Sequence, residues 1–280
     1  MPFARLADRR LLLVKGETAS AFLQNLVTSD LDAIGGDEVR PSALLTPQGK
    51  ILFDFLLSRI EDGIRIDVAS IARADLLKRL TLYRLRAPIA FETPETEVFA
   101  IWDEEVGSVD RRFAETSVRR LYGEAPAGIE ERPSAEFEAL RIRAGIAEAE
   151  RDFPASDVFP HDVLLDQNAG VSFKKGCYVG QEVVSRMQHR GTARRRLVLV
   201  EADGHLTPGA EIQAGERPIG TVLTATGGAG MAIVRIDRLA AALAADIALA
   251  ADGVRVDVAI PPWAGYVLPE PAPAGEDAGS

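Results

Sequence analysis

The chain has 280 residues, of which 47% are hydrophobic and 26% are charged, and its formal net charge at pH 7 is −10. This length predicts two or three domains rather than one core, and the composition is that of a soluble globular protein. The negative charge argues against binding of nucleic acid or of a membrane surface by the chain as a whole, but it does not exclude a local basic site.

Cysteine and histidine are scarce. Cys177 is the single cysteine, and His161, His189 and His205 have no paired spacing. An intramolecular disulfide is therefore excluded, which fits a reducing compartment, and we expect a cytoplasmic location. Neither a four-cysteine iron–sulfur nest within the chain nor a metal site is expected. No stretch reaches the roughly 20 apolar residues of a membrane span, and the apolar run 11–14 is too short for a signal peptide.

Hydrophobic periodicity organises the first 145 residues. Strands are predicted at 11–14, 51–57, 64–68, 89–91 and 98–102, and helices at 18–27, 74–85 and 135–144. Thr18 and Ser134 are the expected N-caps, and Gly145 is the expected C-cap. Asp54 interrupts an apolar strand. We expect its side chain to face solvent, the alternative being a half-buried carboxyl with a raised pKa.

The character of the chain changes towards the C-terminus. Residues 149–170 form a long irregular segment, which in a compact protein is often functional. Beyond Gly191, short strands and glycine turns recur about every ten residues, as in a small antiparallel barrel. Within it, a helix is expected at 239–251 and a closing strand at 254–258. We assign residues 1–193 to an α+β region of two intertwined subdomains, the second at about 41–110, residues 194–266 to the barrel and 267–280 to a disordered tail.

The cysteine lies in the stretch Lys174-Lys175-Gly176-Cys177-Tyr178-Val179-Gly180-Gln181-Glu182. A glycine-flanked turn that leads into a short helix places free N–H groups and the positive end of a helix dipole near the thiol. Two lysines add to this field and Glu182 opposes it. Such surroundings favour a reactive thiolate, whereas a buried and inert cysteine is the alternative.

A basic run follows the cysteine and crosses the expected domain boundary near residue 193: Arg186, Arg190, Arg194, Arg195 and Arg196. Clustered guanidinium groups suit carboxylates or phosphates, and Arg84 and Arg86 are further candidates for the same surface. A solvated face is the alternative, and RNA binding through this run is a third interpretation. The glycines at 227–230 lead into a strand, so they predict a hairpin turn and not a dinucleotide site.

These segments together resemble a known family. Residues 175–182 read K-G-C-Y-V-G-Q-E and are similar to the signature K-G-C-[FY]-x-G-Q-E of the YgfZ family of folate-binding proteins. Residues 16–30 resemble the N-terminal helix of that family, residues 45–51 its following turn and strand, and residues 83–86 and 188–191 fall where the family has like residues. The resemblance covers roughly residues 10 to 260.

The family is related to the T-protein of the glycine cleavage system, a tetrahydrofolate-dependent aminomethyltransferase. The resemblance implies an α+β fold with three subdomains in a ring around a central channel, the last being a C-terminal antiparallel β-barrel. It also implies an accessory role in assembly or repair of iron–sulfur clusters, with iron–sulfur enzymes or assembly proteins as partners, tetrahydrofolate in the channel and Cys177 as the key thiol. The expected folate contacts are Lys175, Tyr178, Gln181, Glu182, Arg186, Arg190 and Arg86.

Two departures bear on catalysis. Aminomethyltransferases have adjacent aspartates where this chain has Phe53-Asp54, and a glutamate in an R-L-E-A-G motif where this chain has Arg143. Folate-dependent aminomethyl or methyl transfer is therefore the alternative function, and a stand-alone aminomethyltransferase is not expected.

Overall fold

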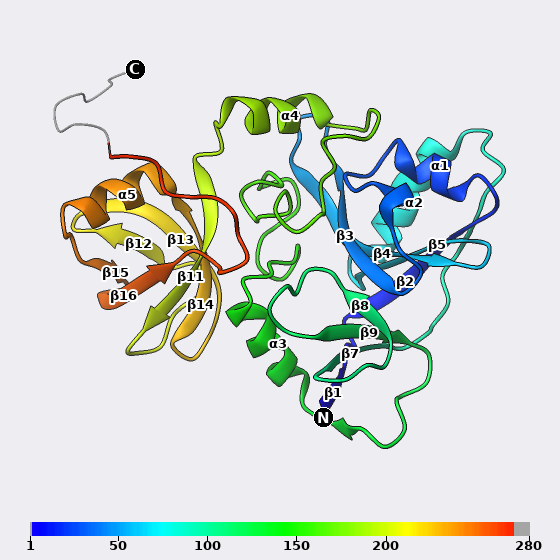
Figure 1. Ribbon diagram of the computed structural model, residues 1–280, viewed down its shortest axis with the longest axis horizontal. Helices are drawn as coiled ribbons and strands as arrows, with labels where there is room; N and C mark the ends of the chain where they lie inside the picture. Colours follow the sequence, from blue (N-terminus) through cyan, green and yellow to red (C-terminus); the bar gives the residue numbers. More distant parts are fainter. Residues whose placement is uncertain (1, 272–280) are drawn as a thin grey trace.

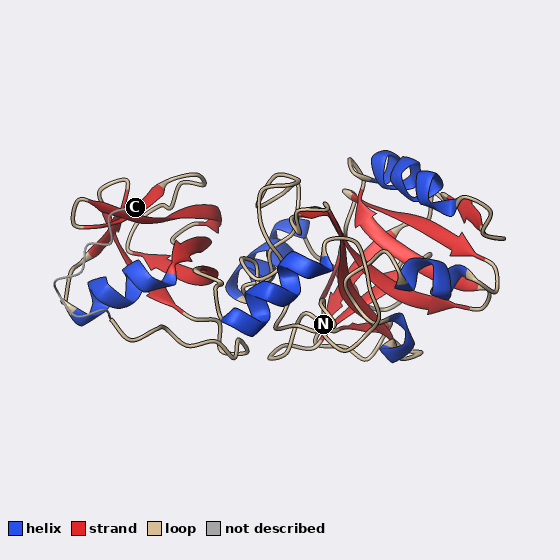
Figure 2. Cartoon of the chain, turned by 90° about the horizontal axis from the view of Figure 1, so that it is seen from above, coloured by secondary structure: helices blue, strands red, loops and turns tan. Residues whose placement is uncertain are grey.

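The computed structural model describes residues 2–271, and the expected tail lies outside the described residues from 272 onward. The molecule is elongated. A large sheet with its helices forms one end, and a separate barrel forms the other (Figure 1). Seen from above, helices and loops lie between these two sheet systems (Figure 2). No helix in residues 2–271 is long and apolar enough to span a membrane.

Ten strands form the large sheet, in the order β10-β1-β7-β9-β8-β3-β4-β5-β2-β6. Their bounds are β1 (Pro2–Arg5), β2 (Arg9–Lys15), β3 (Glu38–Leu45), β4 (Ile51–Ile60), β5 (Gly63–Ala69), β6 (Ala90–Glu92), β7 (Val98–Trp102), β8 (Ser108–Asp110), β9 (Val118–Tyr122) and β10 (Glu130–Glu131). Most neighbours are antiparallel, whereas β3 pairs with β8 and β1 with β10 in parallel.

The sheet has two halves with separate cores. Strands β2 to β6 pack against α1 (Ala19–Gln24) and α2 (Arg73–Arg84), which bury Leu23, Leu76 and Leu80. Strands β1 and β7 to β10 pack against α3 (Ser134–Arg143), with Phe137 in that core. The expected second subdomain at about 41–110 does not follow this division, because β2 pairs with β5 along its whole length and β1 pairs with β7.

The C-terminal part is a closed barrel, in the order β11-β14-β13-β12-β15-β16. Its strands are β11 (Arg195–Ala202), β12 (Glu211–Ala214), β13 (Arg217–Thr226), β14 (Ala229–Arg235), β15 (Leu249–Ala251) and β16 (Val254–Ala259). The helix expected at 239–251 is shorter. Helix α5 (Ile236–Ala244) ends before a turn, and the last three expected helical residues form β15. Alanine suits a helix but does not prevent a strand when barrel pairing competes.

The helix ends differ in detail from the expectation. Thr18 is the N-cap of α1 and Pro133 that of α3, and neither cap makes a side-chain hydrogen bond. Ala144 caps the C-terminus of α3. Gly145 follows with φ +70°, and a Cβ there would lie only 3.0 Å from Pro261 Cγ. Glycine is therefore needed where the segment after the barrel returns to α3.

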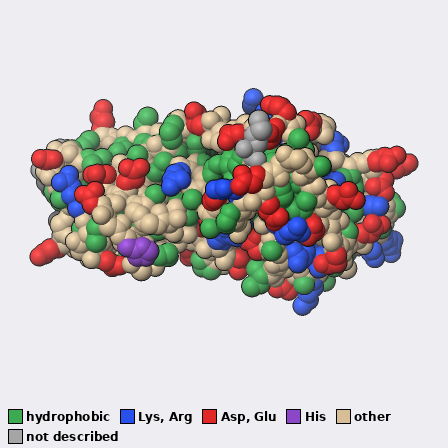
Figure 3. All heavy atoms as spheres, turned by 90° about the horizontal axis from the view of Figure 1, so that it is seen from below, with side chains coloured by type: hydrophobic (Ala, Val, Ile, Leu, Met, Phe, Trp, Pro, Cys, Tyr) green, Lys and Arg blue, Asp and Glu red, His purple; other side chains and the backbone are tan. Residues whose placement is uncertain are grey.

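Charged side chains of both signs are interspersed over the face seen from below, on the barrel as well as on the larger part (Figure 3). No extended patch of a single sign covers this face. The net charge of −10 is thus not concentrated in one acidic region there.

Candidate functional site

Lys175 anchors the loop that carries the cysteine. Its Nζ donates hydrogen bonds to the carbonyl oxygens of Val27 and Ser29, at 2.8 Å each, and lies over the ring of Tyr178. Burial lowers the pKa of Lys175 to about 8. The ammonium thus holds the loop against the segment after α1, so it is engaged by the protein's own backbone and not turned to a ligand.

Tyr178 and Gly180 fix the other side of the loop. Tyr178 is only 6% exposed and packs in a core cluster, and burial raises its pKa to about 12. Its backbone N–H donates to Oε1 of Gln181, the first residue of α4 (Gln181–Arg190). Gly180 has φ +80°, and a Cβ there would lie 2.5 Å from the carbonyl oxygen of Thr46. Only glycine allows this close approach.

Cys177 is exposed between these anchors. The alternative of a buried cysteine is therefore wrong, while the reactivity of the thiol stays a prediction. In residues 2–271 no three His, Cys, Asp or Glu side chains are grouped so that they could hold a metal ion. The loop consequently presents one thiol to the surroundings, on a backbone that Lys175 and Tyr178 hold in place.

The expected folate contacts fall into two groups, because Lys175, Tyr178 and Gln181 contact one another whereas the other charged residues of the set are exposed. Glu182 and Arg186 form an exposed ion pair on α4, at 2.5 Å, and Arg190 is exposed at the end of that helix. Arg86 is exposed just beyond α2. None of the seven expected residues lines any of the five main cavities in the described part of the chain. The loop and the short helix α4 are present as the motif predicted, while the seven folate contacts stay a prediction.

The basic run is also dispersed. Arg195 pairs with Asp162 at 2.5 Å, and Arg196 is buried and pairs with Asp166 at 2.8 Å. These two arginines thus join the start of the barrel to the irregular segment 149–170. Together with Arg186, three of the five arginines in the run are matched by carboxylates, which favours a structural role over a nucleic-acid surface.

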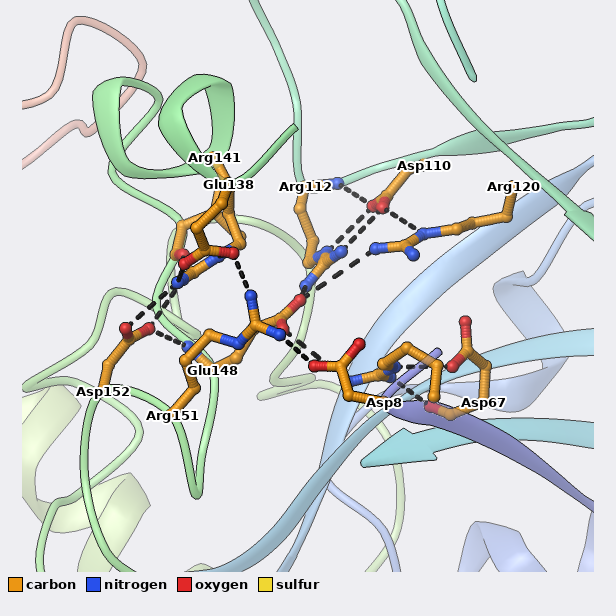
Figure 4. A network of polar contacts seen from close by, with 12 residues as sticks. Asp8, Asp67, Asp110, Arg112, Arg120, Glu138, Arg141, Glu148, Arg151 and Asp152 are labelled. Carbon is orange, nitrogen blue, oxygen red and sulfur yellow. Dashed lines mark hydrogen bonds and ion pairs between the residues drawn. The ribbon is translucent and has the colours of Figure 1, made fainter. Parts of the chain in front are cut away.

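A buried charge cluster lies within the part of the molecule that contains the ten-stranded sheet (Figure 4). Its members are four arginines and four acids: Arg9, Arg112, Arg120, Arg141, Asp67, Asp110, Glu148 and Asp152. Arg112 donates to Glu148 at 2.6 Å and to Asp110 at 2.8 Å, and Arg141 donates to Asp152 at 2.6 Å. Burial alone would raise the pKa of Glu148, but the surrounding guanidinium groups hold it well below its ordinary value.

Asp54 borders this cluster, which contradicts its expected orientation towards solvent. It lines a cavity of about 20 Å³ with Arg9 and Arg112. Burial, and then repulsion by Glu148, raise its pKa to about 6. The segment 147–168 covers this face of β4, which the strand pattern alone could not reveal. A cavity of this volume holds about one water molecule, so folate does not fit at this position.

We expect Asp54→Asn to stabilise the protein above pH 6. In the fold the carboxyl has its pKa near 6, above that of the unfolded chain near 4. Its stabilising contribution is therefore fully present below pH 4 and is lost as the pH rises through 6. The variant should gain up to about 3 kcal/mol in the free energy of unfolding at pH 7.5 and little at pH 4. Urea unfolding at both pH values checks this, and an equal gain at both would contradict it.

A much larger cavity, of about 640 Å³, opens beside α3. Both tryptophans of the chain line it, Trp102 at the end of β7 and Trp263 after the barrel. The indole N–H of Trp263 donates to the carbonyl oxygen of Ala144 at 2.7 Å, which fixes that ring. Phe113 completes the aromatic wall, and Arg143, Glu115 and Glu136 supply charge. We call this site the tryptophan cavity.

The tryptophan cavity fits a flat, polar aromatic molecule. Its volume lies in the range of small-molecule sites, which combine apolar walls with a few polar groups. Aromatic faces stack against heterocyclic rings. Arg143 can pair with a carboxylate, and the carboxylate of Glu115 can accept hydrogen bonds from ring N–H and amino groups. No local pattern in the sequence predicts this cavity, because its walls come from segments far apart in the chain.

The comparisons with known proteins agree with this architecture. Residues 194–266 match the family model described as the CAF17 C-terminal beta-barrel domain. The chain is 29% identical to the human protein named iron-sulfur cluster assembly factor IBA57, over 92% of this chain and 84% of that protein. An IBA57 homologue from Chaetomium globosum is 28% identical over 70% of this chain, and the chain spans about half of the length of that fungal protein.

Both relatives are named as mitochondrial proteins, which contradicts the cytoplasmic location expected from the sequence. Cysteine usage reports redox conditions and not a particular compartment, so this inference was too specific. These comparisons support the coarser similarity to IBA57 and CAF17 proteins, while the finer resemblance to YgfZ proteins stays a prediction.

The crystal structure of the glycine cleavage system aminomethyltransferase T from Bartonella henselae superposes with a TM-score of 0.74. The match covers 94% of this chain and 86% of that chain, at 16% sequence identity. This confirms the predicted T-protein-like α+β fold. The chain thus has the aminomethyltransferase T fold, ends in a CAF17-type β-barrel and is similar in sequence to iron–sulfur cluster assembly factors.

Proposed function

We propose that this protein is an accessory factor for the assembly or repair of iron–sulfur clusters, acting through Cys177. The observation that carries this proposal is the exposed thiol on a loop held by Lys175 and Tyr178. Its similarity over most of its length to proteins named as iron–sulfur cluster assembly factors supports the same role.

A single thiolate supplies one ligand to a cluster, and clusters take about four. If the cluster is cargo that Cys177 touches, its remaining ligands come from a partner protein, such as an iron–sulfur enzyme or another assembly protein. The exposed position of the thiol suits such sharing, since a partner can reach it without unfolding of the loop. The anchors keep the sulfur at a defined place while the partner binds.

The test is complementation. Cells that lack their own protein of this kind should regain the activity of an enzyme that depends on a [4Fe–4S] cluster when they express this chain. Cluster content of the purified client enzyme is the second readout. Normal protein levels without recovery of cluster content would argue against the proposed function.

We further propose that the tryptophan cavity binds tetrahydrofolate or a derivative. The aromatic walls would stack on the pterin and benzoyl rings, Arg143 would pair with a glutamate carboxylate of the ligand, and Glu115 would accept from the pterin amino group. Glu115 thereby offers a carboxylate to the site in which Arg143 replaces the family's glutamate. This proposal places the ligand beside α3, away from the seven contacts that the family resemblance implies.

Tetrahydrofolate is expected to quench the tryptophan fluorescence of the protein to a saturable end point, because both tryptophans lie in the cavity. Arg143→Ala should weaken binding by about 10- to 100-fold, the usual cost of a lost charge-assisted hydrogen bond. Arg194→Ala is the matched control, since Arg194 is an exposed arginine outside the cavity. Equal affinity of the Arg143→Ala variant and the wild type would exclude this cavity.

A further inference from the structure

Helix α2 exposes large apolar side chains on its outer side. Leu82 is 65% exposed and Leu85, its C-cap, is 86% exposed, while Ile71, just before the helix, is 74% exposed. At 100° per residue, positions 78, 82 and 85 lie along one line of the helix. The opposite side buries Leu76 and Leu80 in the core, so this side has no covering element of its own.

Positive charge surrounds these leucines. Lys78, Arg79 and Arg86 are exposed and form no ion pair with any residue in the described part of the chain. One carboxylate, Asp75, lies a turn before Lys78. Elsewhere in this acidic protein most arginines pair with carboxylates, so unpaired cations beside exposed leucines mark this surface. We call it the α2 outer face: Ile71, Asp75, Lys78, Arg79, Leu82, Leu85 and Arg86.

The backbone at Leu85 adds a second and independent observation. Leu85 has φ +46° and ψ −106°, a conformation that residues with a side chain rarely adopt. Glycine is the usual residue where a helix ends in a left-handed conformation. Here a leucine adopts this strained backbone conformation, and its side chain points into solvent. Because Leu85 is 86% exposed, its side chain buries little surface against the described residues 2–271 that could offset this strain.

We propose that the α2 outer face is a docking surface for an acidic partner protein, with Leu82 and Leu85 inserting into an apolar recess of that partner. Leucines that become buried on binding, with a rim of cations, match the anatomy of protein interfaces, in which an apolar centre is surrounded by charges that guide association. A helix that lies on a membrane presents a broad apolar face to lipid. The broad apolar face of helix α2 packs against the core instead. A protein is therefore favoured over a membrane as the partner of the outer face.

Photo-cross-linking tests the proposal in cells that express the full chain. A benzophenone side chain is placed at position 82, and at position 243 as the matched control, because Leu243 on α5 is also exposed, at 50%. A protein that cross-links only from position 82 is then purified, and its affinity for the wild-type chain is measured by calorimetry.

The proposal predicts that the double variant Lys78→Glu, Arg79→Glu weakens this affinity at least about tenfold and that high salt weakens the wild-type complex. Leu85→Gly should raise the melting temperature while it weakens binding, a combination that general damage to the fold would not produce. The proposal is overturned if affinity is insensitive to the charge reversal, if position 82 cross-links only to a second copy of this chain, or if only vesicles of phosphatidylglycerol bind the face. Since none of these readouts involves Cys177, the result is independent of the proposed cluster role.

Discussion

Cys177→Ala is expected to abolish restoration of the [4Fe–4S] enzyme in the complementation test, to the level of cells without the protein. The thiol is exposed and makes no packing contribution that alanine would remove. Lys175, Tyr178 and Gly180 hold the loop from either side, so its backbone should keep its conformation. The melting temperature of the variant should therefore stay within about 2 °C of the wild type, as for most surface substitutions.

Two further variants make the result specific to sulfur. Lys174→Arg keeps the charge of an exposed neighbour whose side chain anchors nothing in the described structure, and it should keep wild-type activity. Cys177→Ser preserves size and polarity but replaces the soft thiolate that iron prefers, and it should fail like alanine. Full recovery with either cysteine variant would remove the thiol from the mechanism.

The parts of the molecule that were predictable depend on local pattern. The barrel follows from regularly spaced strands and turns, and the cysteine loop follows from glycines whose conformations only glycine tolerates, as at Gly180. The helices at 74–85 and 135–144 follow from their apolar spacing and appear as α2 and α3. In each case, interactions between residues that are close in the sequence largely determine the local structure.

The rest required contacts between distant segments. Asp54 seemed to face solvent because its strand alternates, yet the segment 147–168 covers that face. The short strands β1, β8 and β10 have little periodicity of their own and form by pairing. No sequence pattern indicates that Trp102 and Trp263 lie close together. The chain returns from the barrel to α3, and this return puts both side chains in one cavity. The arginine run looked like a ligand surface because its carboxylate partners lie elsewhere in the chain.

Glu148→Gln is expected to destabilise the protein by about 3–5 kcal/mol, the usual cost of removing one partner of a buried ion pair. Glu148 is buried between Arg112 and Arg141, and the variant leaves these guanidinium groups with one carboxylate fewer. Urea unfolding at pH 7.5 measures the change. Glu136→Gln breaks an exposed pair with Arg132 and serves as the matched control, with stability nearly unchanged.

A double-mutant cycle then asks whether Asp54 belongs to the same cluster. With Glu148 present, Asp54 is repelled when it ionises, so Asp54→Asn stabilises the protein at pH 7.5. Without Glu148, burial still opposes ionisation of Asp54, but the repulsion is gone and the guanidinium groups of Arg9 and Arg112 still lower its pKa. In the Glu148→Gln background Asp54→Asn should therefore stabilise the protein less at pH 7.5, with a coupling energy of about 1–3 kcal/mol. The smaller gain is decisive, because two independent sites would give the same effect of Asp54→Asn in both backgrounds.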